Sequence, residues 1–248
     1  MGVLPEQNGL FSILDKVEST NNYATGQAHA GLARHGAAWF ATEQVSGRGQ
    51  RGKTWKSAPG ENIILSVTIR PDQVFTPHPF LLSVCTANIC REFFAAFAGE
   101  ETKIKWPNDI YWRDRKTGGI LIENIYKGSE WIWAIIGIGI NVNQTGFDPT
   151  IGNAGSLAQI TNKKYDALSL AKQLHRLFRD KLGKIDKENV EEQLEMYNDR
   201  LYQRKKTVRL KKNNAAFETE IIGVNRYGQL LTKDVVERVF EVGEVTWI

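Results

Sequence analysis

The chain has 248 residues, which is enough for one domain of ordinary to large size, or for a domain of about 200 residues with a small appendage. Its content of 42% hydrophobic and 24% charged residues is that of a soluble globular protein. A net charge of +4 is compatible with anionic ligands but is too weak to argue for DNA binding by itself.

The cysteines, the histidines and the hydropathy pattern narrow the class of protein further. Cys85 and Cys90 are the only cysteines and do not share a face of the helix expected around them, so we expect buried thiols in a reducing compartment. The histidines are scattered without ligand spacing, and we expect no tightly bound metal. The N-terminus lacks a signal-peptide pattern, and the longest apolar stretch, residues 131–147, is too short and polar to span a bilayer. These features predict a cytoplasmic protein without a membrane partner.

The first part of the chain predicts strands that alternate with helices. Strands are expected over residues 10–17, 37–42 and 62–69, and apolar residues at helical spacing predict a helix over residues 80–97 with Gly99 beyond its end. After the first strand, Glu18-Ser19-Thr20-Asn21-Asn22 offers N-cap side chains to a helix that ends near Ala30. A capped helix alone explains these polar residues, but hydroxyls and amides at such a junction also suit a small polar ligand.

The connection between the second and third expected strands is rich in glycine and positive charge. Its sequence is Gly47-Arg48-Gly49-Gln50-Arg51-Gly52-Lys53-Thr54-Trp55. It can bring backbone N–H groups and cationic side chains against an anion, because glycine permits close approach and positive φ angles. Trp55 adds a flat apolar face on which a purine can stack. The combination indicates a nucleotide site.

Three other interpretations of this loop compete with the nucleotide site. A mobile, solvated connection between two strands is an equally common role for such a loop. An RGG-type RNA-binding segment would be long and repetitive, whereas this one occurs once between apolar segments. The spacing of a Walker A loop is met only nominally, since the Pro59-Gly60 turn argues against the helix that must follow.

Residues 103–112 are typical of a strand that Pro107 must interrupt with an edge or a bulge. Asn108 and Asp109 follow the proline and lie between apolar flanks. A surface Pro-Asn-Asp turn is the alternative, but the flanks favour a functional turn anchored in the core. A hairpin comes next, with a polar tip at residues 113–117 and Lys116 where its second strand begins. A lysine there is either solvated or reaches into a pocket.

A second hairpin at residues 127–129 leads to a strand over residues 131–143. Gly137 and Gly139 alternate on one face of this strand. Alternate glycines remove side chains where something lies flat against a sheet; close backbone packing is the competing explanation. Residues 144–155 are expected to form a flexible loop, and together with residues 45–54 they are candidates for folding over a ligand.

The last third of the chain predicts helices followed by a small β domain. Helical segments are expected from residue 156 through residues 167–182 and 190–201, and the composition changes near Tyr202 into a basic cluster that ends at Lys212. Strands are expected at 217–224, 230–233, 239–242 and 245–248, with a turn at 225–228. A β-barrel of about 45 residues fits this tail. Its basic cluster is either a solvated face or a docking surface for an acidic partner.

The polar residues singled out above suit the joining of two anions. The sequence offers no recognisable Ser-His or Cys-His dyad, metal cluster or close pair of acids; its prominent polar residues are cations, glycines and amides. Such groups stabilise charge on a phosphate by electrostatic preorganisation. Attack of a carboxylate on the α-phosphate of ATP is a reaction of this kind, and its ionised nucleophile requires no base.

The same segments resemble the motif set of biotin protein ligases. The strings ESTN, GRGQRGKTW, KWPND, KTGGILIE and GIGINVN occur in this order between Glu18 and Asn143. The resemblance implies an α+β fold in which a mixed, mostly antiparallel sheet has helices packed on one side (residues 1–203), followed by an SH3-like β domain (residues 204–248). It also implies that biotin and MgATP form biotinyl-5′-AMP and pyrophosphate. A lysine of a biotin carboxyl carrier protein then attacks this intermediate, and AMP leaves.

The resemblance further implies a role for each matching residue. Catalysis would rest on Lys116 and Arg48, which contact the carboxylate and the α-phosphate, and on Asp109, which orients or deprotonates the attacking amine. That amine needs help, because a free lysine has a pKa of about 10.4 and is protonated at neutral pH. The implied biotin-binding residues are Ser19, Thr20, Asn21, Gln44, Gly47, Arg48, Gly49, Gln50, Lys116, Gly119 and Gly137. The implied ATP-binding residues are Trp55 over the adenine, Asn108 and Asn141 along the nucleotide, Arg51 and Lys53 near the phosphates, and Arg48 and Lys116 at the reacting end.

Two features depart from the family pattern. Many members have arginine where this chain has Gln50, so we expect weaker retention of the adenylate. Some relatives begin with a helix-turn-helix domain, whereas this chain starts about ten residues before its first expected strand, so we expect no operator binding.

Three rival functions remain open at the level of the sequence. A lipoate ligase shares the fold and the acyl-adenylate chemistry. A nucleic-acid-binding module would use the glycine loop and the basic tail. A catalytically inactive ligand-binding protein would not require Lys116, Arg48 and Asp109 together. Exposed strand edges are compatible with a homodimer, and the sequence does not decide between monomer and dimer.

Overall fold

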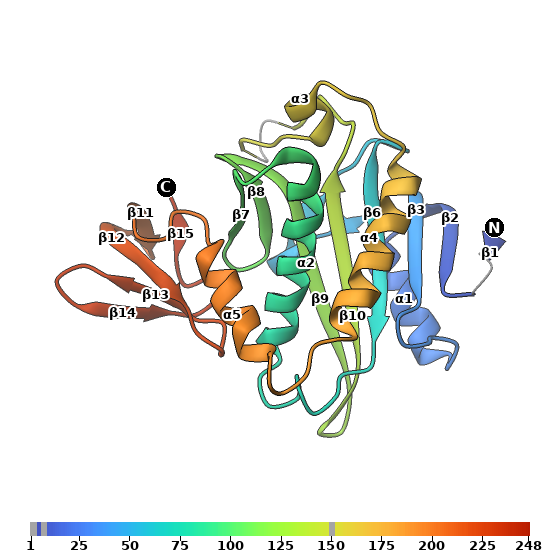
Figure 1. Ribbon diagram of the computed structural model, residues 1–248, viewed down its shortest axis with the longest axis horizontal. Helices are drawn as coiled ribbons and strands as arrows, with labels where there is room; N and C mark the ends of the chain where they lie inside the picture. Colours follow the sequence, from blue (N-terminus) through green and yellow to red (C-terminus); the bar gives the residue numbers. More distant parts are fainter. Residues whose placement is uncertain (1–3, 6–8, 149–151) are drawn as a thin grey trace.

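The computed structural model describes residues 4–5, 9–148 and 152–248 and contains two main sheets (Figure 1). The larger is an eight-stranded mixed sheet in the order β1-β2-β3-β6-β10-β9-β8-β7, and the smaller is a five-stranded sheet in the order β14-β13-β12-β11-β15. In the larger sheet β2 and β3 run parallel, whereas the other neighbouring strands run antiparallel. The expected α+β class with a mixed, mostly antiparallel sheet is therefore confirmed. The expected packing of helices on one side is wrong, because both faces of the sheet are apolar and both carry helices.

The elements follow the sequence pattern closely. The strands of the larger sheet are β1 (Leu4–Pro5), β2 (Phe11–Val17), β3 (Ala38–Gln44), β6 (Asn62–Ile69), β7 (Thr102–Lys105), β8 (Asp109–Trp112), β9 (Arg115–Lys127) and β10 (Glu130–Asn141). The helices are α1 (Thr20–His29), α2 (Phe80–Ala98), α3 (Leu157–Thr161), α4 (Ala167–Leu182) and α5 (Val190–Asp199). The C-terminal sheet contains β11 (Thr207–Lys212), β12 (Ala215–Val224), β13 (Leu230–Lys233), β14 (Glu237–Phe240) and β15 (Thr246–Trp247).

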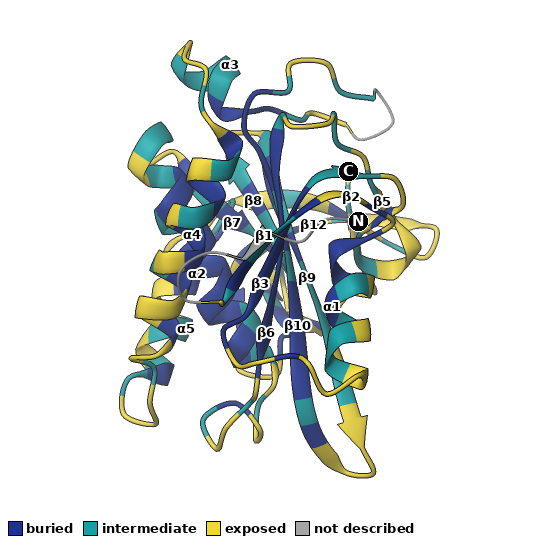
Figure 2. Ribbon diagram, turned by 90° about the vertical axis from the view of Figure 1, so that its right-hand side faces the viewer, coloured by how far each residue is buried: buried dark blue, intermediate teal, exposed yellow. Residues whose placement is uncertain are grey.

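The two faces of the large sheet carry different layers (Figure 2). On one face α2, α4 and α5 pack over the largest apolar cluster of the described residues. On the other face α1 packs over a second cluster that includes Ala24, Trp39 and Ile135. Because both faces are covered, every residue of β6 is buried, as expected for a strand in the middle of such a sheet. The face that carries α1 is where the candidate site lies.

The central helix α2 explains the behaviour of both cysteines. By length and composition α2 could cross a membrane, but most of it is buried in the core of this structure. Cys85 and Cys90 are buried within it, as predicted. Burial raises the pKa of Cys85 to about 12 and also raises the pKa of Cys90. Both thiols are therefore held in the protonated, unreactive form.

Residues 102–112 differ from the single interrupted strand that the sequence suggested. They form a tight antiparallel hairpin of β7 and β8, with a cis Trp106-Pro107 bond in the turn and Lys105 paired with Asp109. The predicted apolar anchors are confirmed, since Trp106 and Ile110 are buried. β7 is an edge strand, but the segment after α5 bonds to it through Ile104 N–H to Arg200 O and Tyr202 N–H to Ile104 O.

The C-terminal sheet contacts the large sheet through the β7–β8 hairpin and the end of α5. Trp106 Nε1 donates to Gly228 O at 2.9 Å, and Tyr197 Oη donates to Pro107 O at 3.1 Å. Asn198 bonds to both the N–H and the carbonyl of Val224. Since residues 197–204 contact both sheets, the division at residues 203 and 204 stays a prediction.

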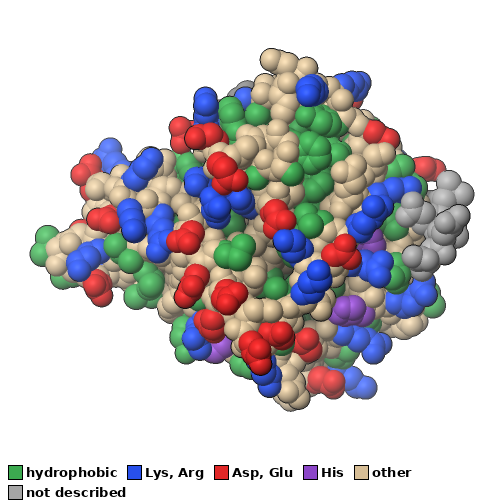
Figure 3. All heavy atoms as spheres, in the orientation of Figure 1, with side chains coloured by type: hydrophobic (Ala, Val, Ile, Leu, Met, Phe, Trp, Pro, Cys, Tyr) green, Lys and Arg blue, Asp and Glu red, His purple; other side chains and the backbone are tan. Residues whose placement is uncertain are grey.

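The basic cluster that begins at residue 204 contains a strand that the sequence analysis missed. β11 lies inside it and pairs with β12 on one side and β15 on the other in the C-terminal sheet. Several of the sheet's cations are paired with acids, including Arg204 with Asp199 and Lys212 with Glu244. Figure 3 shows blue and red side chains mixed over this part of the surface. Lys205, Lys206, Arg209 and Lys211 are exposed, so the cluster is a solvated face, and its use as a docking surface stays a prediction.

Candidate active site

A cavity of about 1110 Å³ lies on the α1 side of the large sheet. Residues from α1, the glycine-rich loop, β7 to β10 and the C-terminal sheet line it. Every residue that the sequence analysis assigned to the site lines this cavity except Gly47. Gly47 lies just behind the wall, because a Cβ added there would approach the Gln44 amide and the Trp55 carbonyl to 2.3 Å. The structure thus brings the predicted residues together, while their individual roles remain predictions.

The floor of the cavity is a strip of glycines on β9 and β10. Gly119 and Gly139 are paired across the two strands, and Gly137 pairs with Leu121. A Cβ on Gly139 would come within 2.5 Å of the Trp55 indole, and one on Gly137 within 2.5 Å of Asn21 Oδ1. The alternate glycines therefore do make room for flat groups. In this structure those groups are side chains of the protein itself.

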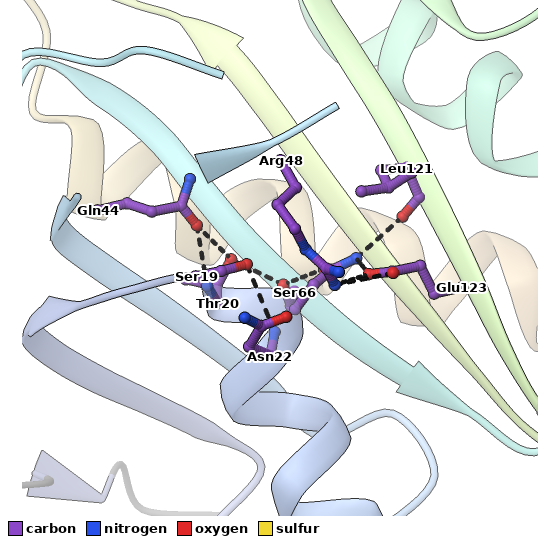
Figure 4. Close-up of polar contacts among 9 residues, drawn as sticks. Ser19, Thr20, Asn22, Gln44, Arg48, Ser66, Leu121 and Glu123 are labelled. Atoms are coloured by element: carbon purple, nitrogen blue, oxygen red, sulfur yellow. Dashed lines mark hydrogen bonds and ion pairs between the residues drawn. The ribbon is translucent and has the colours of Figure 1, made fainter. Parts of the chain in front are cut away.

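One end of the cavity is a polar cradle at the N-terminus of α1 (Figure 4). Ser19 caps the helix by accepting from the N–H of Asn22. The side-chain oxygen of Gln44 accepts from the N–H of Thr20 at 2.9 Å and from its hydroxyl at 3.3 Å. Helix capping and ligand orientation are thus compatible uses of these residues, because the cap fixes the side chains that face the cavity.

Ser66 and Glu123 support this cradle through hydrogen bonds to Thr20 and Asn21. The Ser66 hydroxyl lies 2.8 Å from the Thr20 hydroxyl and donates to Asn21 Oδ1 at 2.6 Å. Asn21 Nδ2 in turn donates to Glu123 Oε2 at 2.8 Å. Asn21 is almost completely buried, so its amide is fixed at both ends by hydrogen bonds.

Arg48 forms an ion pair with Glu123. Its Nη2 lies 2.8 Å from Oε1 and 2.6 Å from Oε2 of that carboxylate (Figure 4). The side chains of Arg48 and Glu123 are 43% and 31% exposed, so a ligand anion can compete for the guanidinium. Glu123 thereby orients Arg48 toward the cavity.

Lys116 and Asp109 form the second ion pair of the site. Lys116 Nζ lies 2.6 Å from Asp109 Oδ1, and the two side chains are 25% and 23% exposed. The β8–β9 hairpin brings them together, and Asp109 pairs with Gly119 across it, next to the glycine strip. The sequence left two alternatives for Lys116, a solvated side chain or one that reaches into a pocket, and the structure has it in the cavity wall.

The remaining nucleotide-side residues are held by backbone contacts. Asn108 Nδ2 donates to Ile120 O at 2.5 Å, and Asn141 Nδ2 donates to Gly155 O at 3.0 Å. Arg51 donates to Val242 O of the C-terminal sheet at 3.1 Å. The indole N–H of Trp55 is buried and has no hydrogen-bond partner in the part of the chain that the structure describes.

The glycine-rich loop is a small hairpin in this structure. β4 (Gly47–Arg48) pairs with β5 (Thr54–Trp55), and a 3₁₀ turn at Gln50–Gly52 joins them. Arg51 adopts a positive φ of 56° in that turn. Part of the other expected lid, residues 149–151, lies outside the described residues.

The sequence analysis missed three cavity or support residues, which are Ser66, Glu123 and Lys105. Ser66 had a signal, since Asn62, Ser66 and Thr68 are polar residues of one parity in an otherwise apolar strand. Glu123 closes the motif that contains Lys116 and has the same parity as Gly119. No local signal marks Lys105, because two of its three aromatic neighbours, Tyr202 and Trp247, come from distant segments.

Comparison with known proteins agrees with this geometry. Residues 13–141 match the model of the biotin/lipoate A/B protein ligase family. This match spans more than half of the chain. The chain belongs to that family. The bifunctional ligase/repressor BirA of Escherichia coli K12 is 32% identical over 184 residues, which are 73% of this chain and 56% of that protein.

Other relatives and solved structures fit the same assignment. A biotin–[acetyl-CoA-carboxylase] ligase of Mycobacterium tuberculosis is 31% identical over 137 residues, covering 54% of this chain and 50% of that protein. The chain spans about half the length of the curated relatives it matches. A biotin protein ligase from Aquifex aeolicus, solved with biotin and ATP, has a TM-score of 0.75 at 24% identity over 95% of this chain and 97% of that one. At this identity the structural likeness shows the fold.

The glycine strip generates a prediction for stability. In a Gly137→Ala variant the new methyl group would meet the buried Asn21 amide, which hydrogen bonds hold in place. We expect the free energy of unfolding to fall by about 1–3 kcal/mol. Gly146→Ala is the matched control, because nothing lies within 4 Å of an added Cβ there. Urea unfolding of both variants measures the difference, and equal stabilities would contradict the packing described here.

Proposed function

We propose that the protein is an ATP-dependent biotin protein ligase. It would join biotin to ATP as biotinyl-5′-AMP with release of pyrophosphate, and then transfer the biotinyl group to a lysine of a biotin carboxyl carrier protein with release of AMP. The observation that carries the proposal is a cavity lined by two cations at different places: Arg48, which Glu123 holds beside the polar cradle, and Lys116, which Asp109 holds beside Gly119 and Trp55. The family assignment and the relatives named as biotin ligases support it.

The chemistry of the cradle favours biotin over lipoate. The ureido ring of biotin carries two N–H donors and one carbonyl acceptor, whereas the dithiolane ring of lipoate forms no strong hydrogen bonds. Ser19, Thr20, Asn21 and Gln44 offer hydroxyl and amide groups at that end of the cavity. Most of these groups are paired within the protein, but no described residue accepts from the Ser19 hydroxyl or from the Gln44 amide N–H groups. An apolar ring that left these donors unpaired would cost about 1–3 kcal/mol per group. Polar residues here therefore select for the ureido ring.

In the first step an oxygen of the biotin carboxylate attacks the α-phosphorus of ATP. A bond forms between them, the bond from the α-phosphorus to the bridging oxygen breaks, and pyrophosphate leaves with the electron pair. Arg48 and Lys116 offset the negative charges of the two reactants, which otherwise repel each other. Both cations must first exchange a protein carboxylate, Glu123 or Asp109, for a substrate anion. ATP would enter as its Mg²⁺ complex, so Mg²⁺ belongs to the substrate.

In the second step the amine of the carrier lysine attacks the acyl carbon of the mixed anhydride. The carbon–nitrogen bond forms, the carbon–oxygen bond to AMP breaks, and the amine loses a proton. Asp109 is the carboxylate placed to accept that proton or to orient the amine. Once Lys116 turns toward the phosphate, Asp109 is released from its ion pair. The movement of the Lys116 side chain from Asp109 to the phosphate would thus prepare the site for both steps. We place this activity in the cytoplasm, where ATP and carrier proteins occur.

The choice of acid is tested by exchange of pyrophosphate into ATP. We expect wild-type protein to catalyse exchange with biotin, but at least about tenfold less with lipoate or octanoate. Lys116→Ala should lower biotin-dependent exchange by about 10²-fold or more, because it removes a charge from the reacting phosphate. Lys127→Ala, at the far end of β9, is the matched control and should leave exchange unchanged. Exchange that depends on lipoate alone would point to the other branch of the family.

The role of Asp109 is tested by separating the two steps. We expect Asp109→Asn to slow transfer from preformed biotinyl-5′-AMP by about 10²–10⁴-fold, because the amine loses its proton acceptor. Adenylation should change by less than about tenfold, since its nucleophile arrives ionised. Both rates are measured by single-turnover assays with a purified carrier domain. Losses of equal size in the two steps would indicate that Asp109 acts by positioning Lys116 and does not act on the amine.

A further inference from the structure

Lys105 is a half-buried cation in an aromatic cage at the end of the cavity opposite the cradle. Its Nζ lies 4.7 Å from the ring centre of Tyr111, 4.9 Å from that of Trp247 and 5.4 Å from that of Tyr202. The rings also contact one another, with Tyr202 5.2 Å from Tyr111 and 5.9 Å from Trp247. The cage therefore combines a strand of the large sheet, the segment after α5 and the last strand of the C-terminal sheet.

The cage stabilises the ammonium group without neutralising it. Aromatic faces attract a cation through their quadrupole, but Lys105 makes no ion pair with any described carboxylate. Burial lowers its pKa, Lys116 and Lys53 act in the same direction, and Asp109 and Asp114 oppose them. Burial also raises the pKa of Tyr111 and Tyr202, so both phenols stay neutral. Asp109 is already bonded to Lys116, and Asp114 accepts from Tyr202.

A buried ammonium group without a carboxylate partner is costly unless an anion completes its environment. Lys105 lines the cavity, and its hydrogen bond to Tyr111 Oη is a weak one at 3.4 Å. Its ammonium carries three donors. At least two of them are therefore free to bind a ligand, and the neighbouring Lys53 adds positive charge to this end of the cavity.

The position of Lys105 relative to the other residues indicates which anion it binds. Register pairs place Gly139, Gly119, Asp109 and Lys105 in one row across β10, β9, β8 and β7. Neighbouring strands are about 4.8 Å apart, so Lys105 lies roughly 10 Å beyond Gly119, on the side away from the cradle. In an in-line displacement the leaving group departs opposite the nucleophile. With the carboxylate arriving from the cradle, the leaving group departs toward Lys105.

We propose that caged Lys105 binds the pyrophosphate part of ATP and receives it as the leaving group of the adenylation step. This inference rests on the proposed function. When the bond from the α-phosphorus to the bridging oxygen breaks, the electron pair stays on pyrophosphate, and Lys105 donates charge-assisted hydrogen bonds to that anion. Pyrophosphate takes no part in the transfer step, so Lys105 acts in only one of the two half-reactions.

The experiment compares Lys105→Met with Lys103→Met. Methionine keeps an unbranched side chain but removes the charge, and Lys103 lies two residues earlier on the same face of β7 without lining the cavity. Biotin-dependent exchange should show KM values for ATP and pyrophosphate that rise about 10- to 100-fold in Lys105→Met. Biotin affinity and the rate of transfer from preformed biotinyl-5′-AMP should stay within about twofold of wild type. Lys103→Met should match wild type throughout.

Two further variants keep the inference testable if Lys105→Met folds poorly. Lys105→Arg retains the charge and should recover most of the affinity for pyrophosphate. Trp247→Leu removes one ring of the cage and leaves the ammonium, so it should raise the KM for ATP by a smaller factor and again spare the transfer step.

Two results would overturn the role of Lys105 while leaving the proposed function intact. One is exchange kinetics for Lys105→Met that equal those of Lys103→Met. The other is a loss of equal size in adenylation and in transfer, which would indicate a role at the shared centre or in folding. Wild-type protein that shows no biotin-dependent exchange would overturn the proposed function itself, and this inference with it.

Discussion

The structure of the site depends on how positive charge is held around a cavity before an anionic ligand binds. Arg48 is held by Glu123 and Lys116 by Asp109, and all four side chains are partly exposed. Ion pairs of this kind contribute about 0–1 kcal/mol. Exchanging such a carboxylate for a substrate phosphate or carboxylate is therefore cheap, whereas cations without any partner would repel one another and disorder the loop. The carboxylates keep the cations in place, and in the proposed reaction they would release them to the substrate. Lys105 is held differently, because aromatic rings contact its ammonium group and do not neutralise its charge.

The C-terminal sheet is part of the site because it contacts two of the cations that line the cavity, Lys105 and Arg51. Trp247 forms one wall of the Lys105 cage, and Arg51 of the glycine-rich loop donates to Val242 O. A Cβ on Gly243 would overlap the Arg51 guanidinium, so that turn accepts the arginine only because it carries glycine. The hydrogen bond from Trp106 to Gly228 fixes the sheet against the β7–β8 hairpin that carries Asp109. A small domain that looks like an appendage in the sequence thus positions cations on two sides of the cavity. Its basic cluster at residues 204–212 does not line the cavity.

Features set by residues close together in the sequence could be predicted, whereas contacts between residues far apart in the sequence could not. The N-cap at Ser19, the strand at residues 62–69 and the helix α2 are set by local pattern, and the structure has them where that pattern placed them. The ion pair of Arg48 with Glu123 joins residues 75 positions apart, and the bond of Asn21 to Glu123 spans 102 positions. No local signal fixes such partners. β11 was missed because its cations hid a strand whose inward residue, Leu210, is completely buried. The position of α1 on the face opposite the other helices is also a consequence of packing, since its own sequence is only weakly amphipathic.

Trp55 is the contact between the glycine-rich loop and the glycine strip on the cavity floor. Its ring lies on Gly139 and beside Gly119, so the loop hairpin closes directly onto the floor of the cavity. The indole N–H is buried without a partner among the described residues, which costs about 1–3 kcal/mol. A ligand oxygen at that point recovers this energy, while an apolar ligand of the same shape does not. The loop is held by the short β4–β5 ladder, by the bond from Gly49 N–H to Lys53 O, and by two partly exposed side-chain contacts, Arg48 with Glu123 and Arg51 with Val242 O. None of these contacts belongs to the apolar core, so the tryptophan can shift without disturbing the core. An unsatisfied donor on a weakly held loop therefore favours closure over a ligand that carries an acceptor, which is the chemistry of an adenylate more than that of a hydrocarbon chain.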